Sequence, residues 1–353
     1  MSHASPNSVS TFRPGIRDSV LNLLARAASA HPDREFVVVD GQPLTYGELD
    51  RLSNAMAHKL AELGVSAGKC VVTLLDSSTD VFVCWFAINK LGAIWVPINT
   101  AYRGEFLRHQ VHDTEAEVVI SDPHYLERFV QIADGIPCVK IILCRNLTET
   151  PDCHIPIRSL DEYRGNDTSP SGIEVKPSDL AALLYTSGTT GPSKGCMISH
   201  NYLAAVGRIN RRHTILEEGQ TLFTCLPLFH AAALSAAIAV MSDASRIAIS
   251  SQFSVRRFWD DIEASGAVSA LLMASIFQLV AQAPDCDAAK RCYGQLKMIF
   301  GFPITPEVRK IWRERFGVPL ASSWSYGQTE AIRITAVPIG ETPPETCAGR
   351  VVD

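Results

Sequence analysis

The sequence lacks several features that would assign it to a common functional class. It has no Cys-x-x-Cys pair, and the closest cysteines, Cys138 and Cys144 or Cys286 and Cys292, match no zinc or redox spacing. Its formal net charge is −5, so no basic face is indicated and a nucleic-acid partner is disfavoured. The longest apolar run, residues 231–241, is too short for a membrane span and predicts a buried helix.

The N-terminal segment lacks the apolar core of a signal peptide. Residues 1–15 are rich in serine and proline, and we expect them to form a flexible N-terminus. The chain has ten cysteines, and without a secretory leader these predict free thiols in a reducing compartment. We therefore expect a cytoplasmic protein.

The composition provides ample material for a hydrophobic core. Of the 353 residues, 46% are hydrophobic and 20% are charged, and the length predicts about two domains or one multi-lobed domain. Short apolar segments alternate with helical patterns, and the predicted strands include 36–39, 71–75, 94–97, 118–120, 139–143, 223–226 and 297–300. This alternation predicts an α/β fold whose parallel strands are covered by helices on both faces.

Local signals mark several helix starts and one interruption. Thr45 and Glu48 fit a capping box, and Ser199, Ser254 and Thr305 are predicted N-caps. The stretch 146–177 is rich in Pro, Asp, Ser and Gly, so we predict a lobe boundary there within one large domain that starts at residue 16.

One stretch, residues 185–195, has the composition of a phosphate-binding loop. It reads YTSGTTGPSKG and follows an apolar segment. Glycines let backbone N–H groups approach an anion closely, hydroxyl groups add donors, and Lys194 adds a positive charge. It is not the nucleoside-triphosphatase signature, because Gly195 follows the lysine where serine or threonine is required. The alternative is a flexible Gly/Ser/Thr surface loop.

A second cluster, residues 324–330, reads WSYGQTE. Tyr326 could stack on a nucleotide base, Thr329 could bind a phosphate, and Glu330 could bind Mg²⁺ through its carboxylate. By itself, such a short cluster is also typical of an ordinary turn.

Two histidine-containing segments complete the candidates. The segment 226–230 reads LPLFH, and His230 either borders a binding pocket or is a hydrogen-bonded histidine at a strand end. His109 and His112 are spaced i, i+3 beside Asp113, and without a third ligand at a suitable spacing they predict an exposed helix face.

Taken in this order, the three clusters resemble the AMP-forming acyl-CoA synthetases of the adenylate-forming superfamily. The resemblance covers nearly the whole chain, starting from the TYGEL segment at residues 45–49. Segments 96–100, 253–261 and 349–351 are most similar to the crotonobetaine/carnitine-CoA ligase branch, which acts in fatty acid or carnitine metabolism. The resemblance implies a large N-terminal domain made of two layered αβα lobes.

The resemblance also assigns site residues. It implies that Thr186, Lys194 and Glu330 are catalytic, that Glu330 and the Thr186 hydroxyl hold Mg²⁺, and that His230, Ala231 and Trp324 line an acyl pocket. The implied ATP-binding residues are Thr186, Ser187, Gly188, Thr189, Thr190, Lys194, Gly301, Phe302, Pro303, Tyr326, Gly327 and Thr329. Two positions depart from the family pattern: Phe302 replaces a small residue, and Ser193 replaces a common proline.

The implied reaction joins a small-molecule carboxylic acid to adenylate, releases pyrophosphate, and transfers the acyl group to coenzyme A. ATP, Mg²⁺ and CoA are the implied cofactor and co-substrates. Relatives continue past the position of Asp353 into a small C-terminal domain with a catalytic lysine, so we expect this chain to be truncated and to react slowly. Two alternatives stay open: an adenylate-forming enzyme that loads a carrier protein or an oxygen acceptor, and a non-catalytic nucleotide- or acyl-binding module.

Overall fold

Two seven-stranded sheets organise the protein. The computed structural model describes residues 17–186, 191–301, 304–322, 325–341 and 347–352. In the first sheet, all neighbouring strands are parallel except the last pair, β8 and β9. The order is β7 (Ile157–Ser159), β6 (Ile141–Cys144), β5 (Val118–Ser121), β3 (Cys70–Leu74), β4 (Ile94–Pro97), β8 (Leu180–Thr186) and β9 (Lys194–Ser199).

The second sheet repeats this plan with a different pair at its antiparallel edge. Its neighbouring strands are parallel except β1 and β2. The order is β14 (Leu320–Ser322), β13 (Met298–Phe300), β12 (Ser269–Leu271), β10 (Thr221–Thr224), β11 (Arg246–Ile249), β1 (Glu35–Val39) and β2 (Gln42–Thr45). The N-terminal strands thus join the sheet formed by the later half of the chain.

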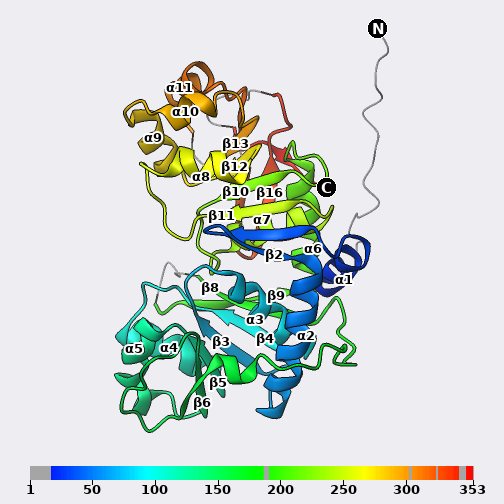
Figure 1. Ribbon diagram of the computed structural model, residues 1–353, viewed down its shortest axis with the longest axis vertical. Coiled ribbons are helices and arrows are strands. Elements are labelled where there is room, and N and C mark those ends of the chain that lie inside the picture. The colour runs from blue at the N-terminus through cyan, green and yellow to red at the C-terminus, as the bar shows by residue number, and fades with distance from the viewer. Residues whose placement is uncertain (1–16, 187–190, 302–303, 323–324, 342–346, 353) are drawn as a thin grey trace.

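Helices cover both sheets in three layers (Figure 1). One core cluster joins α1, α2, α3 and α7 to strands of both sheets, a second packs α8, α9 and α11 on the second sheet, and a third packs α4 and α5 on the first. The helices are α1 (Val20–Ala30), α2 (Tyr46–Glu62), α3 (Thr79–Lys90), α4 (Gly104–Asp113), α5 (Leu126–Val130), α6 (His200–Arg212), α7 (Ala231–Met241), α8 (Phe258–Ser265), α9 (Ala274–Gln282), α10 (Asp287–Arg291) and α11 (Pro306–Phe316). The predicted α/β fold of two layered lobes is confirmed, with the middle helices shared between them.

A small third sheet lies beside the second. It consists of β15 (Ser325–Gln328), β16 (Ala331–Ala336) and β17 (Arg350–Val351), all paired antiparallel. Its first hairpin contains most of the WSYGQTE cluster, and β16 contacts helix α6. This contact is what brings the cluster toward the rest of the site.

Several predicted helix starts are confirmed by their hydrogen bonds. Thr45 and Glu48 form the full capping box of α2, and the Ser199 and Thr305 side chains accept the first-turn N–H groups of α6 and α11. The prediction for Ser254 is wrong, because its carbonyl rather than its hydroxyl accepts from the Arg257 N–H, closing a turn before α8 begins.

The sheets also test the predicted end of one strand and the position of the segment 146–177. Strand β10 ends at Thr224 rather than residue 226, because the Thr224 hydroxyl accepts from the Leu226 N–H at 3.2 Å and turns the chain. The segment 146–177, proposed above as a lobe boundary, connects β6 to β8 with β7 between them, and all three strands belong to one sheet. The chain passes between the two sheets before β3 and after β9.

Within the described residues, the longest helices fall short of the length and apolar character needed to span a membrane. The prediction that 231–241 forms a buried helix is confirmed by α7, in which nearly every residue is buried. All ten cysteines are free thiols, as the sequence predicts.

Candidate active site

A cavity of about 770 Å³ opens at the carboxyl ends of the strands in the second sheet. The segments that follow β10, β12, β13 and β14 all contribute to its wall, together with α6, α7 and the β15–β16 hairpin. In parallel α/β sheets, ligands bind in the crevice outside these strand ends. The residues from these segments include Leu226, Pro227, His230, Leu272, Met273, Ala274, Gly301 and Ser322.

The predicted phosphate loop joins β8 to β9 as an antiparallel hairpin. Thr186 pairs with Lys194 in the last register position before the loop, and the Lys194 side chain is exposed. Ser187, Gly188, Thr189 and Thr190 lie outside the described residues, so their contact with phosphate stays a prediction. The structure places Thr186 and Lys194 opposite each other at the base of the loop.

Helix α4 holds the base of this hairpin, a role that the sequence did not reveal. The Tyr185 hydroxyl donates to Asp113 at 2.6 Å, the Gln110 amide donates to the Ser193 hydroxyl at 3.0 Å, and His109 Nε2 lies 2.9 Å from the Ser193 carbonyl. Burial, followed by the Asp113 carboxylate, raises the pKa of Tyr185, so the phenol stays protonated and donates. These contacts join residues more than 70 positions apart, and no local pattern could have signalled them.

The histidine pair on α4 therefore has two different environments. His112 is exposed, as predicted, but His109 is partly buried against the hairpin and meets the Tyr185 ring edge-on, so its assignment to the exposed face is wrong. Neither belongs to a cluster spaced for a metal ion among the described residues. The group with such spacing is Asp76, Asp122 and His124, where Asp122 already accepts from Arg145 and the Asp76 N–H.

Helix α6 connects the two predicted nucleotide clusters. It starts directly after β9, and its Tyr202 hydroxyl donates to the Thr329 carbonyl at 2.8 Å. Burial, followed by the negative charge of Glu330, raises the pKa of Cys196 on β9. The Tyr202 contact ties the Thr329 turn to the helix that follows β9, and the roles of Thr329 and Glu330 toward a nucleotide stay predictions.

Glu330 and Thr186 are chemically suitable for Mg²⁺. Both offer oxygen ligands, the Glu330 side chain is exposed, and no described residue forms an ion pair with it. Mg²⁺ is commonly held by one or two carboxylates together with substrate phosphates and water. This arrangement fits a metal ion bound jointly with a nucleotide.

The predicted adenine wall is only partly described. Tyr326 is 55% exposed on β15 and is free to stack on a base, while Phe302, Pro303 and Trp324 lie outside the described residues. A Cβ on Gly301 would lie 2.0 Å from the Leu272 carbonyl oxygen, and one on Gly327 would lie 2.6 Å from the Arg333 nitrogen. The protein's own backbone therefore requires both glycines, whatever their part in ligand binding.

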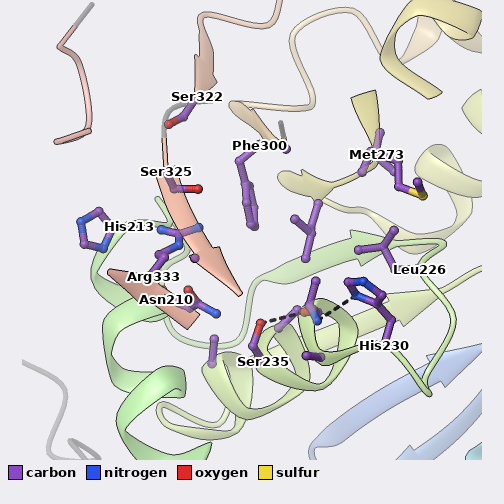
Figure 2. A pocket seen from close by; sticks show the side chains of 18 of the residues that line it. Asn210, His213, Leu226, His230, Ser235, Met273, Phe300, Ser322, Ser325 and Arg333 are labelled. Carbon is purple, nitrogen blue, oxygen red and sulfur yellow. Dashed lines mark hydrogen bonds between the residues drawn. The ribbon is translucent and has the colours of Figure 1, made fainter. Parts of the chain in front are cut away.

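His230 lines the pocket and caps helix α7 (Figure 2). Its Nδ1 accepts from the Ala232 N–H at 3.1 Å, so in the neutral ring the proton lies on Nε2. Loss of hydration lowers the pKa of His230, which favours this neutral form. Ala231 and the other small residues of α7 leave space beside the ring, so a carboxylate there could accept a hydrogen bond from the Nε2–H group.

Several residues that line the pocket were not predicted as site residues, and three of them carry polar or charged groups deep in its wall. Asn210 and His213 near the end of α6, and Arg333 on β16, line the side of the cavity across from His230 (Figure 2). One signal was available in the sequence, a single arginine in the apolar segment AIRITAV. In an antiparallel sheet with one face toward water, however, such a residue ordinarily faces solvent.

Comparison with known proteins identifies relatives of this arrangement. Residues 24–353 match the family model described as AMP-binding enzyme. The chain is 28% identical over 338 residues to the medium/long-chain-fatty-acid–CoA ligase FadD6 of Mycobacterium tuberculosis, covering 92% of this chain and 54% of that protein. It is 28% identical over 295 residues to the crotonobetaine/carnitine–CoA ligase of Salmonella arizonae, covering 82% and 56%. The chain thus spans about half the length of these curated relatives.

Solved structures show the same fold. The anthranilate CoA ligase AuaEII in complex with anthranoyl-AMP superimposes with a TM-score of 0.86 at 20% identity, covering 96% of this chain and 65% of that chain. The inhibitor-bound N-terminal domain of FACL13 from Mycobacterium tuberculosis gives 0.78 at 22% identity, covering 88% and 76%. The two-sheet architecture is therefore that of the N-terminal domain of adenylate-forming enzymes.

Proposed function

Because the chain belongs to the AMP-binding enzyme family, we propose that it forms the nucleotide- and acyl-binding part of an ATP-dependent acid–thiol ligase. Such a ligase activates a carboxylic acid as acyl-AMP, releases pyrophosphate and passes the acyl group to CoA. The observation that carries the proposal is the link, through helix α6, between the strand that leaves the phosphate loop and the hairpin that borders the cavity. Helix α6 follows β9 directly, its Tyr202 hydroxyl donates to the Thr329 carbonyl, and Thr329 lines the cavity together with His230.

The arrangement suits the chemical difficulty of the reaction. A carboxylate and ATP are both anionic, so their approach needs positive charge and hydrogen-bond donors around the phosphates. Lys194 would provide positive charge at the base of the phosphate loop, and Glu330 with Thr186 would hold Mg²⁺, which supplies charge neutralisation at the phosphates when bound. The neutral His230 ring would donate a hydrogen bond from its Nε2–H group to the carboxylate of the acid, which keeps the carboxylate oriented.

The supporting relatives agree on the class of reaction. FadD6 and the Salmonella protein are both named as CoA ligases, and the AuaEII structure is described as containing an acyl adenylate. We therefore propose ATP, Mg²⁺, a carboxylic acid and CoA as ligands of this chain, and a cytoplasmic location.

The experiment measures nucleotide binding first and chemistry second. Titration calorimetry of the chain with ATP should show binding that requires Mg²⁺ and is weakened in the Lys194→Met variant. Incubation with ATP, Mg²⁺, a panel of carboxylates and hydroxylamine should then give acid-dependent hydroxamate, with release of pyrophosphate and AMP. Absence of Mg²⁺-dependent ATP binding would overturn the proposal. Transfer to a carrier-protein thiol but not to CoA would correct the acceptor.

A further inference from the structure

Arg333 places a positive charge in the pocket, and the described residues offer it no partner of opposite charge. The residue is partly buried and lines the cavity, and no described residue forms an ion pair or hydrogen bond with its side chain. Its guanidinium lies 6.0 Å from the centre of the Phe300 ring, at the outer limit of a cation–π contact. Arginine is rarely withdrawn from water unless it is paired, so this site is incomplete without an anion.

The backbone at Arg333 is held in an uncommon conformation. Its φ is +56°, in the left-handed region, within a strand whose pairing with β15 shifts register between Tyr326 and Gln328. Gly327 allows this backbone conformation, because a side chain at position 327 would collide with the backbone nitrogen of Arg333. Bulges and left-handed residues cost free energy, and they concentrate at functional sites where they redirect a side chain. The strained backbone conformation therefore occurs at the same residue whose guanidinium lacks a described partner.

The neighbouring polar groups point to the same conclusion. Asn210 is 7% exposed, and its Oδ1 has no hydrogen-bond partner among the described residues. A turned amide would present its NH₂ group as a donor instead. Burial lowers the pKa of Arg333 to about 10, and no described carboxylate offsets this lowering. Burial, and after it the positive charge of Arg333, lowers the pKa of His213. One side of the pocket thus has donors and positive charge but no acid.

We propose that Arg333 is a specificity-determining residue that binds a second carboxylate of the acyl substrate, so that this site selects dicarboxylic acids over simple fatty acids. The inference rests on the proposed function, since it assigns the class of acid that the pocket receives. One carboxylate lies at the reaction side with His230, and the other meets the Arg333 guanidinium with Asn210 beside it (Figure 2).

The chemistry of arginine favours this partner. Its planar guanidinium offers paired N–H donors that match the two oxygens of a carboxylate, and the pairing is stronger in a site with little water. A saturated fatty acid would displace the remaining water around Arg333 without replacing its hydrogen bonds, which disfavours binding. The apolar and small residues between the two sides, among them Phe300, Ala236 and Ala239, accommodate the methylene chain.

The test compares acids that differ only in their far end. The chain, with Mg²⁺ and a non-hydrolysable ATP analogue, is titrated with matched dicarboxylates, monocarboxylates and ω-amino acids of four to eight carbons; adipate, hexanoate and 6-aminohexanoate form one set. At the best length, the dicarboxylate should bind on the order of ten- to a hundredfold more tightly than the monocarboxylate. The ω-amino acid should bind most weakly.

Variants locate the preference. Arg333→Met should abolish it, Arg333→Lys should retain part of it, and Arg333→Glu should reverse it toward the ω-amino acid. Arg313→Met removes an exposed arginine on α11 and should change nothing. Thermal unfolding and affinity for the ATP analogue, measured on each variant, check that the fold and nucleotide site persist.

The outcomes separate the inference from the proposed function. Equal binding of mono- and dicarboxylates at every length by a chain that binds the ATP analogue would overturn the inference and leave the proposed function standing. Loss of nucleotide affinity in Arg333→Met, without a change in acid preference, would also overturn it and assign Arg333 to the nucleotide. Failure of the unaltered chain to bind the ATP analogue would instead count against the proposed function.

Discussion

The two hairpins that contact helix α6 are stabilised in different ways. The β8–β9 hairpin is anchored by side-chain hydrogen bonds from a helix of its own lobe, through Tyr185, Asp113 and Ser193. The β15–β16 hairpin depends on backbone packing, with Gly327 against the displaced Arg333 and the Tyr202 hydroxyl on the Thr329 carbonyl. The β8–β9 hairpin can lose one side-chain hydrogen bond and keep the others. The β15–β16 hairpin is packed so closely at Gly327 that it leaves little room for an added atom.

This difference matches what each hairpin offers a ligand. The first offers a loop base with an exposed lysine, suited to phosphates that arrive and leave. The second offers Glu330 and Arg333, whose positions must be fixed relative to the pocket. Helix α6 contacts both hairpins. Substitutions at the start of α6 or in either hairpin should therefore show whether side-chain hydrogen bonds or backbone packing stabilise each hairpin.

The largest expected effect comes from the charged end of the second hairpin. Glu330→Gln removes the carboxylate proposed to hold Mg²⁺ and should lower the rate of acid-dependent hydroxamate formation by on the order of 10²–10³. The free energy of unfolding should change by less than about 0.5 kcal/mol, because the Glu330 side chain is exposed. Glu314→Gln, which alters an exposed acid on α11, is the matched control. A rate for Glu330→Gln close to that of the control would remove Glu330 from the metal site.

The start of α6, shared by both hairpins, should be sensitive to acid. His200 is buried, neither ring nitrogen has a described hydrogen-bond partner, and burial lowers its pKa to about 4 from an ordinary value of 6.5. Between these values the unfolded chain binds the proton and the folded chain does not, so stability is complete above pH 6.5 and is lost as the pH falls toward 4. The loss amounts to up to about 3 kcal/mol.

Urea unfolding at several pH values tests this expectation. His200→Phe keeps a ring of similar size but cannot take up a proton, so its free energy of unfolding should fall less between pH 6.5 and pH 4 than that of the unaltered chain. Parallel pH profiles for the two proteins would show that His200 is not the group responsible.

A pair of glycine substitutions compares the two hairpins directly. In Gly327→Ala the new Cβ would lie 2.6 Å from the Arg333 nitrogen, so we expect a loss of about 1–3 kcal/mol in the free energy of unfolding. In Gly195→Ala the nearest atom is a Tyr185 ring carbon at 3.4 Å, and the expected change is within about 0.5 kcal/mol. Similar losses in chemical denaturation of both variants would mean that the hairpins do not differ in packing.

The smallest effect should come from the hydrogen bond at the first hairpin. Tyr185→Phe removes the bond to Asp113 and should cost about 1 kcal/mol, because Asp113 is exposed and water replaces the lost donor. Amide hydrogen exchange should rise in β8 and β9 but not in β15 and β16. Tyr202→Phe should show the opposite pattern. Exchange that rises in both hairpins for either variant would indicate that they open together.

The parts that could be predicted from the sequence are those set by neighbouring residues. The capping box at Thr45 and the N-cap at Thr305 depend on side chains three positions away, and both are confirmed. Ser254 failed because a serine can equally precede a turn, and only the surrounding packing decides between turn and helix. The proposed role of Glu330 rests on the WSYGQTE motif in the same local way, and it stays a prediction.

The parts that could not be predicted depend on distant contacts. The link between Tyr185 and Asp113, and the place of Asn210 beside Arg333, arise only when α4 and α6 pack against strands far along the chain. A strand arginine gives no sign that its backbone turns it toward a cavity. The residues that could not be predicted are therefore those whose environment is set by contacts between elements far apart in the sequence.

The thiol of Cys196, on the strand that leaves the phosphate loop, bears on unwanted chemistry in the proposed reaction. An acyl adenylate reacts readily with thiolates, so a nearby cysteine could acylate itself and inactivate the protein. Burial and the adjacent carboxylate raise the pKa of Cys196, and burial raises the pKa of Cys225 to about 12. Protonated thiols are poor nucleophiles. In the proposed reaction, raised thiol pKa values would keep Cys196 and Cys225 from competing with the acceptor thiol for the activated acid.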